Sequence, residues 1–315
     1  MIENETAGDP MNEQKWIRKS LRPLSRELTN IGHPISHPTV GRLLKKQNYS
    51  LKSNSKNKET NSQNPDRNKQ FKYIKKQKER YKKEKSPIIS IDTKKKELIG
   101  EFKNNGKTWC VKAEEVNVHD FGSEADGKAV PYGIYDIGKN KGYVCLGTSS
   151  DTAEFAVDVI ERWWKNKGII EYPKAKKILI LADSGGSNSC RSRLWKKQIQ
   201  ERLSEQFGLN VMVCHYPTGC SKWNPIEHRL FSYISMNWAG KPLTSYENML
   251  AYIQGTNTVS GLTVEADLLD KIYTKGQKVS NKEMKDLNIK FHKICPRWNY
   301  VISPRVSGNK HEKFY

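Results

Sequence analysis

Residues 177–186 read KILILADSGG, and the arrangement expected for the rest of the chain is built around them. The apolar run at 178–181 is typical of a strand in the middle of a sheet, buried on both faces. Asp183 follows just past the end of this run and precedes Ser184 and two glycines. Ligand-binding groups in open α/β sheets gather at the carboxyl ends of strands, so Asp183 is a candidate site residue. A turn or helix-capping role is the alternative for this acid.

The same pattern of an apolar run followed by an acid recurs in residues 86–100, SPIISIDTKKKELIG. Asp92 ends the run, and Lys94, Lys95 and Lys96 come directly after Thr93. Lysines beside an acidic site are suited to hold a phosphate backbone, and a solvated turn is the alternative. Asp92 is therefore the second candidate acid, and the three lysines are candidate DNA contacts.

A third acid, Glu227, stands at the start of an expected helix in residues 221–234, SKWNPIEHRLFSYI. Asn224 suits the N-cap and Pro225 the first helical position, so Glu227 at the third position could belong to a capping box. A Glu in the first turn can also face the carboxyl edge of the sheet. We prefer the metal-ligand interpretation because the expected fold requires a third acid on a helix.

Three further residues have patterns that bear on this site. Trp223 lies in the polar loop before Glu227 and is a candidate for stacking on unpaired bases. His228 follows Glu227 and is a candidate auxiliary residue. Asp151 precedes the helix expected from residue 152, and its pattern favours an N-cap.

Apolar runs and helical periodicity place eight elements after residue 87. Strands are expected at 88–92, 132–137, 143–148, 177–182 and 209–215, and helices at 152–166, 190–206 and 224–237. Three strands in a meander followed by alternating helices and strands match the ribonuclease H-like fold. We therefore expect an α/β domain with a mixed central sheet and helices on both faces, in which the three acids converge.

Residues 21–48, LRPLSRELTNIGHPISHPTVGRLLKKQN, predict two short helices about a tight turn. Gly32 is placed to stop the first helix, and the second is expected to begin near Pro38. The pattern is typical of a small α-helical helix-turn-helix region, and a generic helical hairpin is the alternative. In the first helix the residues that recur at helical spacing are Leu24, Leu28 and Ile31. In the second, the apolar residues expected to face inward are Val40, Leu43 and Leu44, and the basic residues expected to face outward toward DNA are Arg42, Lys45 and Lys46.

Residues 50–69 are rich in Ser, Asn and Lys, so they cannot bury a core and are expected to form a linker. The basic helix expected at 70–85 either touches phosphates or is simply solvated. The chain is therefore divided into four parts. These are a helix-turn-helix region at 1–49, a basic linker and helix at 50–86, a ribonuclease H-like catalytic domain at 87–260 and a C-terminal extension at 261–315.

The composition favours a polyanionic partner. Lys and Arg number 55 against 34 for Asp and Glu, which gives a formal net charge of +21 over 315 residues. Such a field concentrates nucleic acids. No apolar run of about 18 residues is present and the start is polar, so we expect a soluble, unexported protein without membrane contact. The six cysteines include no CxxC pair and are expected to be reduced thiols.

The three acids together predict a site for a divalent metal. Carboxylates and water suit Mg²⁺, with Mn²⁺ as a substitute, better than zinc. Two ions roughly 3.5 to 4 Å apart, held by Asp92, Asp183 and Glu227, would activate an attacking oxygen and stabilise a leaving 3′-oxygen. In a strongly basic chain, this combination indicates chemistry on nucleic-acid phosphates.

Several stretches of the chain together resemble the Rhodopirellula-type insertion-sequence transposases, a DDE group related to the mariner superfamily. The resemblance runs from about Leu21 to Trp298. The stretches that carry it are ISIDTKKKELIGEFKNNG, VNVHDF, PYGIYDIGKNKGYV, DTAEFAVDVIERWW, ILADSGGSNSCRSRLWK, NPIEHRLFSYISMNW, PLTSYE and GLTV.

The resemblance implies a bacterial mobile-element transposase of the cytoplasm and nucleoid, with its DDE acids on Asp92, Asp183 and Glu227. It implies terminal-repeat and target DNA as partners, with a homodimer or higher oligomer on DNA. Relatives carry more helical sequence ahead of the helix-turn-helix, so an N-terminally truncated copy is expected. An inactive DNA-binding regulator derived from a transposase and a metal-dependent ribonuclease H-like nuclease are the alternatives.

Overall fold

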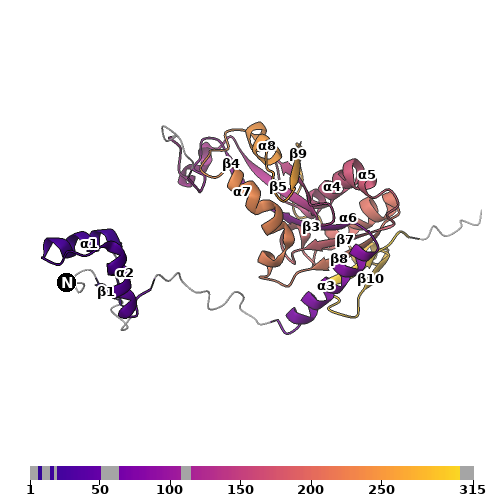
Figure 1. Ribbon diagram of the computed structural model, residues 1–315. Helices are drawn as coiled ribbons and strands as arrows, with labels where there is room; N and C mark the ends of the chain where they lie inside the picture. The colour runs from indigo at the N-terminus through magenta and orange to yellow at the C-terminus, as the bar shows by residue number, and fades with distance from the viewer. Residues whose placement is uncertain (1–5, 9–14, 18–19, 51–63, 108–114, 306–315) are drawn as a thin grey trace, which may run out of the picture. The chain divides into compact units, whose positions relative to one another are not determined.

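The computed structural model describes residues 6–8, 15–17, 20–50, 64–107 and 115–305 (Figure 1). The chain divides into two compact units, Met1–Glu59 and Thr60–Tyr315, and each is considered by itself. Residues 51–63 of the expected linker and Cys110 lie outside the described residues. Within these ranges no helix is long and apolar enough to cross a membrane.

The first unit contains the two expected short helices, α1 (Leu21–Asn30) and α2 (His37–Lys46). A short antiparallel pair, β1 (Thr6–Gly8) with β2 (Lys15–Ile17), precedes them and was not expected. Gly32 has φ of +87°, a left-handed conformation that glycine adopts at little cost, so it ends α1 as predicted.

The apolar contact between α1 and α2 is smaller than the sequence suggested. Leu24 and Val40 are buried, whereas Ile31 is 56% exposed and Leu43 is 46% exposed. A pair of helices covers only one face of each, so apolar residues around the rest of each helix stay in solvent. The inward placement expected for Leu43 is therefore wrong.

The second unit is built on one large mixed sheet. Among the described residues the sheet has nine strands in the order β10-β11-β8-β7-β3-β5-β6-β9, with β4 paired to β5 off this path. The strands are β3 (Ile88–Thr93), β4 (Glu97–Ile99), β5 (Gly127–Asp136), β6 (Lys141–Gly147), β7 (Lys177–Ala182), β8 (Asn210–His215), β9 (Thr263–Leu269), β10 (Ile289–Phe291) and β11 (Asn299–Ile302). At its centre β3 pairs antiparallel with β5 and parallel with β7, and β7 pairs parallel with β8. This confirms the ribonuclease H-like strand order.

Helices cover both faces of the sheet, as expected (Figure 1). The helical segments of the second unit are α3 (Arg67–Lys83), η2 (His119–Glu124), α4 (Ala153–Trp163), η3 (Trp164–Gly168), α5 (Ile169–Glu171), η4 (Gly186–Asn188), α6 (Arg193–Ile199), η5 (Gln200–Glu205), η6 (Ser221–Trp223), η7 (Glu227–Phe231), α7 (Ser232–Asn237), α8 (Tyr246–Gln254) and α9 (Asn281–Lys285). One face of the central strands packs on α4 and α6. On the other face, η7, α7 and α8 cover β6, and α3 covers β7 and β8.

Alternation along β7 explains how one strand serves two cores. Ile178 and Ile180 belong to the core under α4 and α6, while Leu179 and Leu181 belong to the core under α3. Successive side chains of a strand point to opposite faces, so a strand buried on both faces must be apolar throughout. The run at 178–181 therefore lies in the middle of the sheet, as predicted.

Helix α3 corresponds to the basic helix expected at 70–85, and it is an integral part of the second unit. Its Gln70 is fully buried, and the side-chain amide nitrogen Nε2 donates to the His215 carbonyl and to Asn299 Oδ1, each at 2.8 Å. Tyr73 and Ile74 on the same helix are also buried. The basic side chains point outward around this buried stripe, so the helix is amphipathic and docked against the sheet.

Residues expected to form a separate C-terminal extension continue the same sheet on both sides. Strand β9 pairs parallel with β6, and β11 pairs antiparallel with β8. The sheet therefore runs without interruption across the boundary expected at residue 260. These pairings join strands far apart in the chain, which local patterns do not reveal.

Candidate active site

Two of the three candidate acids lie side by side at the carboxyl edge of the central strands. Asp92 is on β3, and Asp183 directly follows β7. The parallel register pairs Ile91 with Ala182, so the next residue on each strand is one of the acids. Neighbouring strands lie about 4.8 Å apart, which brings these two carboxylates into one locality.

The third acid is held near β3 by a buried hydrogen-bond network. Glu227 begins η7. Ser90 on β3 accepts a hydrogen bond from the Ile226 N–H at 3.1 Å and donates one to Asn224 Oδ1 at 2.5 Å. Ser90, Asn224 and Ile226 are all fully buried. The start of the Glu227 helix is therefore fixed to the strand that carries Asp92.

Asn224 has a different role from the N-cap that the sequence suggested. Its Nδ2 donates to the Ile91 carbonyl at 3.1 Å and to Asp183 Oδ1 at 3.4 Å. The Ile226 N–H at the start of this helix instead donates to the hydroxyl of Ser90, which is 136 residues away in the sequence. Asn224 thus links β3, Asp183 and the Glu227 helix. Its Oδ1 accepts from the Ser90 hydroxyl and not from a backbone N–H, so the capping box considered as the alternative role of Glu227 is not formed.

Electrostatics raise the pKa of each of the three acids. Burial is the largest cause for Asp92, and together with the nearby Asp183 and Glu227 charges it raises the Asp92 pKa to about 8. Burial and then the Glu227 charge raise the pKa of Asp183 to about 6. Burial also raises the Glu227 pKa, against the opposing charges of His228 and Lys94. Each carboxylate is thus destabilised by desolvation, and a nearby cation would favour its charged form.

The donor chemistry of this locality fits a hard divalent cation. All three candidate ligands are carboxylates, which Mg²⁺ and Mn²⁺ prefer over the nitrogen and sulfur donors of zinc sites. Among the residues that the structure describes, no three His, Cys, Asp or Glu side chains are already grouped tightly enough to hold a metal ion. The arrangement therefore supplies suitable donors and an excess of negative charge, without a closed coordination cage.

A chain of buried side chains fixes the backbone at Asp183. His215 is fully buried, and burial lowers its pKa to about 4, so its imidazole is neutral at pH 7. Its Nδ1 lies 2.8 Å from the Asp183 carbonyl, and its Nε2 lies 2.9 Å from the Tyr300 hydroxyl. A carbonyl only accepts, so Nδ1 donates to Asp183 and Nε2 accepts from Tyr300. Trp195 Nε1 donates to the same Tyr300 hydroxyl at 2.9 Å.

Asp151 lies closer to the acids than its sequence pattern indicated. The N-cap of α4 is Thr152, whose hydroxyl accepts from the Phe155 N–H at 3.1 Å. Asp151 Oδ1 accepts instead from the hydroxyl of Thr93, the neighbour of Asp92, at 3.2 Å. The N-cap assignment of Asp151 is wrong, and the residue belongs to the surroundings of the candidate site.

The three lysines after Thr93 differ in their surroundings. Lys94 has a side chain that is only 10% exposed, and its Nζ lies 3.0 Å from Glu97 Oε1 and 4.5 Å from the Trp238 ring centre. A buried, paired amine does not reach a phosphate backbone in solvent, so the contact expected for Lys94 is not supported. Lys95 is exposed and Lys96 is half-buried, which leaves both available.

An aromatic surface borders the loop before Glu227. Trp223 is 52% exposed, as expected, and its ring centre lies 6.1 Å from that of Phe71 on α3. The Arg67 guanidinium lies 5.1 Å from the Phe71 ring centre. Sequence patterns pointed to Trp223 but not to Phe71, because only the docking of α3 brings the two together.

The remaining candidate residues are exposed. The imidazole Nε2 of His228 contacts the Lys222 carbonyl, so this ring nitrogen serves the loop. In the first unit, Arg42, Lys45 and Lys46 are exposed on α2, and Arg42 donates to Thr39 Oγ1 at 3.0 Å. Spacings of three and four residues place these basic side chains on one face of α2.

Comparison with known families and structures gives a family match along most of the chain. The family model described as Rhodopirellula transposase DDE domain matches residues 1–304. The comparison with curated proteins finds no match.

Among solved structures, the chain is similar to complexes of the Mos1 transposase. The Mos1 transposase paired-end complex with left transposon end is 14% identical with a TM-score of 0.44, over 75% of this chain. The chain spans 65% of the length of that Mos1 chain, just under two thirds. The Mos1 strand transfer complex is 13% identical with a TM-score of 0.44, over 78% of this chain and 72% of that one.

Proposed function

The chain belongs to the Rhodopirellula transposase DDE-domain family, and on this premise we propose that it is a metal-dependent DNA transposase of a bacterial insertion sequence. In this proposal it cuts DNA at the ends of the element and joins the freed 3′ ends to target DNA. Asp92, Asp183 and Glu227 are its catalytic acids and metal ligands.

The observation that carries the proposal is the convergence of these acids from three distant segments. Asp92 and Asp183 occupy equivalent positions on adjacent parallel strands. Ser90 and Asn224 attach the Glu227 helix to the same strand. A capping or turn role for each acid would not require this common location, whereas a shared cation site does.

Both steps of the proposed reaction are displacements at phosphorus. In the first, a water oxygen bonds to phosphorus while the bond to the 3′-oxygen breaks, which leaves a 3′-hydroxyl on the element end. In the second, this hydroxyl attacks a target phosphodiester and the target 3′-oxygen leaves. One phosphodiester bond is made for each that is broken in the joining step, so no covalent protein intermediate is needed.

In this chemistry the side chains of the protein bind the metal ions and fix the positions of the catalytic acids. Asp92, Asp183 and Glu227 would hold Mg²⁺ or Mn²⁺, which when bound lowers the pKa of the attacking oxygen and stabilises charge on the leaving oxygen. The Asn224 amide orients Asp183 through the bond to its Oδ1. His215 fixes the backbone at the same residue.

DNA binding in this proposal uses basic and aromatic side chains of both units. Arg42, Lys45 and Lys46 on α2 contact the terminal repeats, and Lys95 and Lys96 lie on the segment that follows the Asp92 strand. Trp223 offers an exposed ring for stacking on an unpaired base, a contact worth roughly 1–3 kcal/mol. A homodimer or higher oligomer on DNA would bring two element ends together.

The test is cleavage of element-end DNA in Mg²⁺ by Asp92→Asn, Asp183→Asn and Glu227→Gln variants. Each substitution should reduce cleavage to background while the Kd for the same DNA, measured in EDTA, changes by less than about threefold. Asp286→Asn, which changes an exposed acid at the C-terminal end of α9, is the matched control and should cleave normally. Normal cleavage by Asp183→Asn would exclude the proposed site.

A strand-transfer assay with a pre-cut 3′ end separates a transposase from a nuclease of the same fold. The proposal requires a joined product with target DNA, in addition to the cut. Cutting without joining would identify a nuclease, and DNA binding without either product would identify a regulator.

A further inference from the structure

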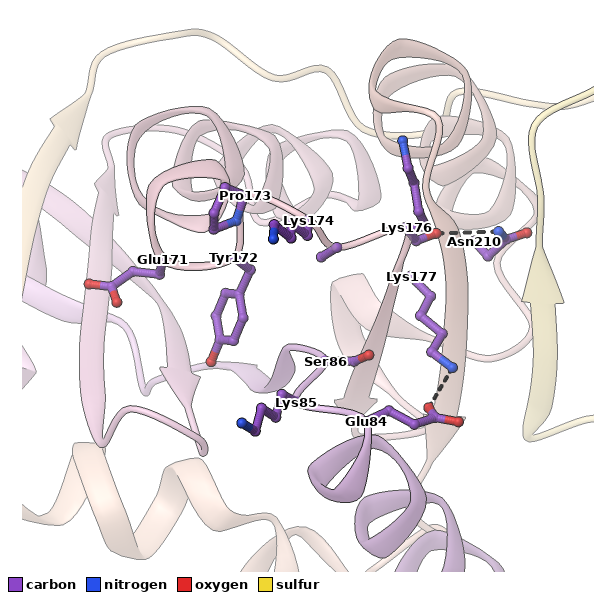
Figure 2. A pocket seen from close by; sticks show the side chains of 11 residues that line it. Glu84, Lys85, Ser86, Glu171, Tyr172, Pro173, Lys174, Lys176, Lys177 and Asn210 are labelled. Atoms are coloured by element: carbon purple, nitrogen blue, oxygen red, sulfur yellow. Dashed lines mark hydrogen bonds and ion pairs between the residues drawn. The ribbon is translucent and has the colours of Figure 1, made fainter.

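A cavity lies at the end of the central strands opposite to the acids, where β7 and β8 begin (Figure 2). Its volume is about 560 Å³. Lys177 starts β7 beside this cavity, and Asp183 follows the other end of the same strand. Six residues of strand at about 3.3 Å each put the cavity roughly 20 Å from the candidate active site. The two sites are therefore separate.

The carboxylates beside this cavity are already neutralised. Glu84 is paired with Lys177, and its Oε1 lies 3.3 Å from Arg80 Nε. The second acid, Glu171, is paired with Lys139 at 3.2 Å and with Lys141 at 2.5 Å. Neither acid is left to balance further positive charge in the cavity.

Three other lysines of the lining have no acidic partner among the described residues. Lys85, Lys174 and Lys176 are exposed, and no carboxylate in the described part of the chain pairs with their amines. Figure 2 shows Lys85 and Lys174 on opposite sides of the open space, and Lys176 on its rim with the side chain directed away from the space. Ser86 adds a hydroxyl to the same wall. The cavity therefore presents several separate cationic donors to one opening.

The spacing of the amines favours an extended anion as the occupant of this cavity. Pockets for small organic ligands are mostly apolar with a few convergent polar groups. Here the amines are distributed around the opening and do not converge on one point. Spaced amines suit an anion whose charges are also spaced, such as the successive phosphates of a nucleic-acid strand.

We propose that this cavity is a second DNA-binding site, in which Lys85, Lys174 and Lys176 contact the phosphodiester backbone of a DNA segment that does not occupy the active site. The inference rests on the proposed function for the identity of the polyanion. It does not depend on the catalytic acids, because the cavity lies at the other edge of the sheet.

The first test compares the salt dependence of DNA binding by the full chain in EDTA. One variant carries Lys85→Gln, Lys174→Gln and Lys176→Gln. The control carries Lys278→Gln, Lys285→Gln and Lys290→Gln, which remove the same charge from exposed positions elsewhere.

If each cavity lysine neutralises one phosphate, the slope of log K against log salt becomes shallower by about 2.7. Between 50 and 200 mM salt, the cavity variant should then lose roughly 40-fold less affinity than the wild type. The control should retain the wild-type slope. Equal slopes in the two triple variants would overturn the inference.

A second measurement locates the contact and identifies the source of the phosphate. Lysines are acylated in EDTA with and without duplex DNA, or with inorganic phosphate, and the modified residues are read by mass spectrometry. Duplex DNA should protect Lys85 and Lys174, while inorganic phosphate at the same phosphate concentration should not. Protection by inorganic phosphate alone would indicate a free-anion site and overturn the DNA assignment, as would no protection at all.

Cleavage assays keep the two proposals distinguishable. If the chain cuts DNA normally but DNA does not protect the cavity lysines from acylation, only the second DNA-binding site is refuted. Failure of the proposed function would instead be seen as normal cleavage by the Asp92, Asp183 and Glu227 variants, whether or not DNA protects the cavity lysines from acylation.

Discussion

The Ser90→Ala substitution tests whether one hydroxyl fixes the geometry of the candidate active site. Ser90 is fully buried, and its hydroxyl both accepts from the Ile226 N–H at 3.1 Å and donates to Asn224 Oδ1 at 2.5 Å. Alanine keeps the volume nearly unchanged but leaves both of these buried partners without the hydroxyl. The expected loss therefore comes from hydrogen bonding and not from a cavity.

The size of the effect follows from the two groups left unsatisfied. Each buried donor or acceptor that loses its partner costs about 1–3 kcal/mol, which gives roughly 3 kcal/mol for the pair. For a unit of this size, about 2–4 °C of melting temperature accompanies each kcal/mol. The melting temperature in EDTA should therefore fall by about 6–12 °C.

Activity should fall as well, because Glu227 loses its attachment to the Asp92 strand. A misplacement of about 1 Å at a reacting centre can cost on the order of 100-fold in rate. We expect a comparable loss of Mg²⁺-dependent cleavage, measured well below the melting temperature, with an unchanged Kd for DNA.

Ser204→Ala is the matched control. Ser204 is equally buried, but its hydroxyl donates to the Leu209 carbonyl at 2.9 Å, away from the acids. This variant should lose stability and keep its cleavage rate. A Ser90→Ala variant that melts within about 2 °C of the wild type and cleaves normally would refute the positioning role.

Three further outcomes are expected. Mg²⁺ at ten times its Kd should stabilise the wild type by about 1.4 kcal/mol, seen as a higher melting temperature. Asp183→Asn should abolish this increase. An equal increase in the variant would exclude Asp183 as a ligand. Gln70→Leu should destabilise the chain in urea by roughly 2–4 kcal/mol, because the buried Asn299 Oδ1 and the His215 carbonyl lose the Gln70 amide donor. A neutral result would mean that α3 is not docked as described. The Lys197 ion pair and a capping box lower the pKa of Glu283 to about 2, so its stabilising effect is present above pH 4.5 and is lost toward pH 2. The difference in melting temperature between wild type and Glu283→Gln should accordingly shrink as the pH falls below about 4.5, and a constant difference would contradict the ion-pair assignment.

The local patterns that were predicted well share a physical cause. Strand β7 was found from four consecutive apolar residues, because burial on both faces leaves no position for a polar side chain. The end of α1 was found from Gly32, because its left-handed conformation strongly favours glycine. In each case the residue type is dictated by its immediate surroundings, so the sequence alone records it.

Residues whose role depends on a distant partner were assigned incorrectly or overlooked. Asn224 has the pattern of an N-cap, yet its amide bonds to Ile91 and Asp183 while Ser90 caps the helix. Lys94 has the pattern of a solvated basic turn, yet it lies paired and buried beside Trp238. A local pattern cannot distinguish these outcomes, because Ser90 and Ile91 lie more than a hundred residues from the start of the Glu227 helix, as Trp238 does from Lys94.

The sequence by itself determined the positions of the central strands along the chain, the chemical type of the three acids and the strongly basic character of the chain. These properties follow from hydrophobic periodicity and composition, which are local and additive. Only the tertiary structure decided that Ser90 joins the Glu227 helix to β3, that α3 docks against the sheet, and that unpaired lysines surround a cavity at the opposite edge. Long-range strand pairing and burial set these contacts, and no single segment of the chain encodes both partners.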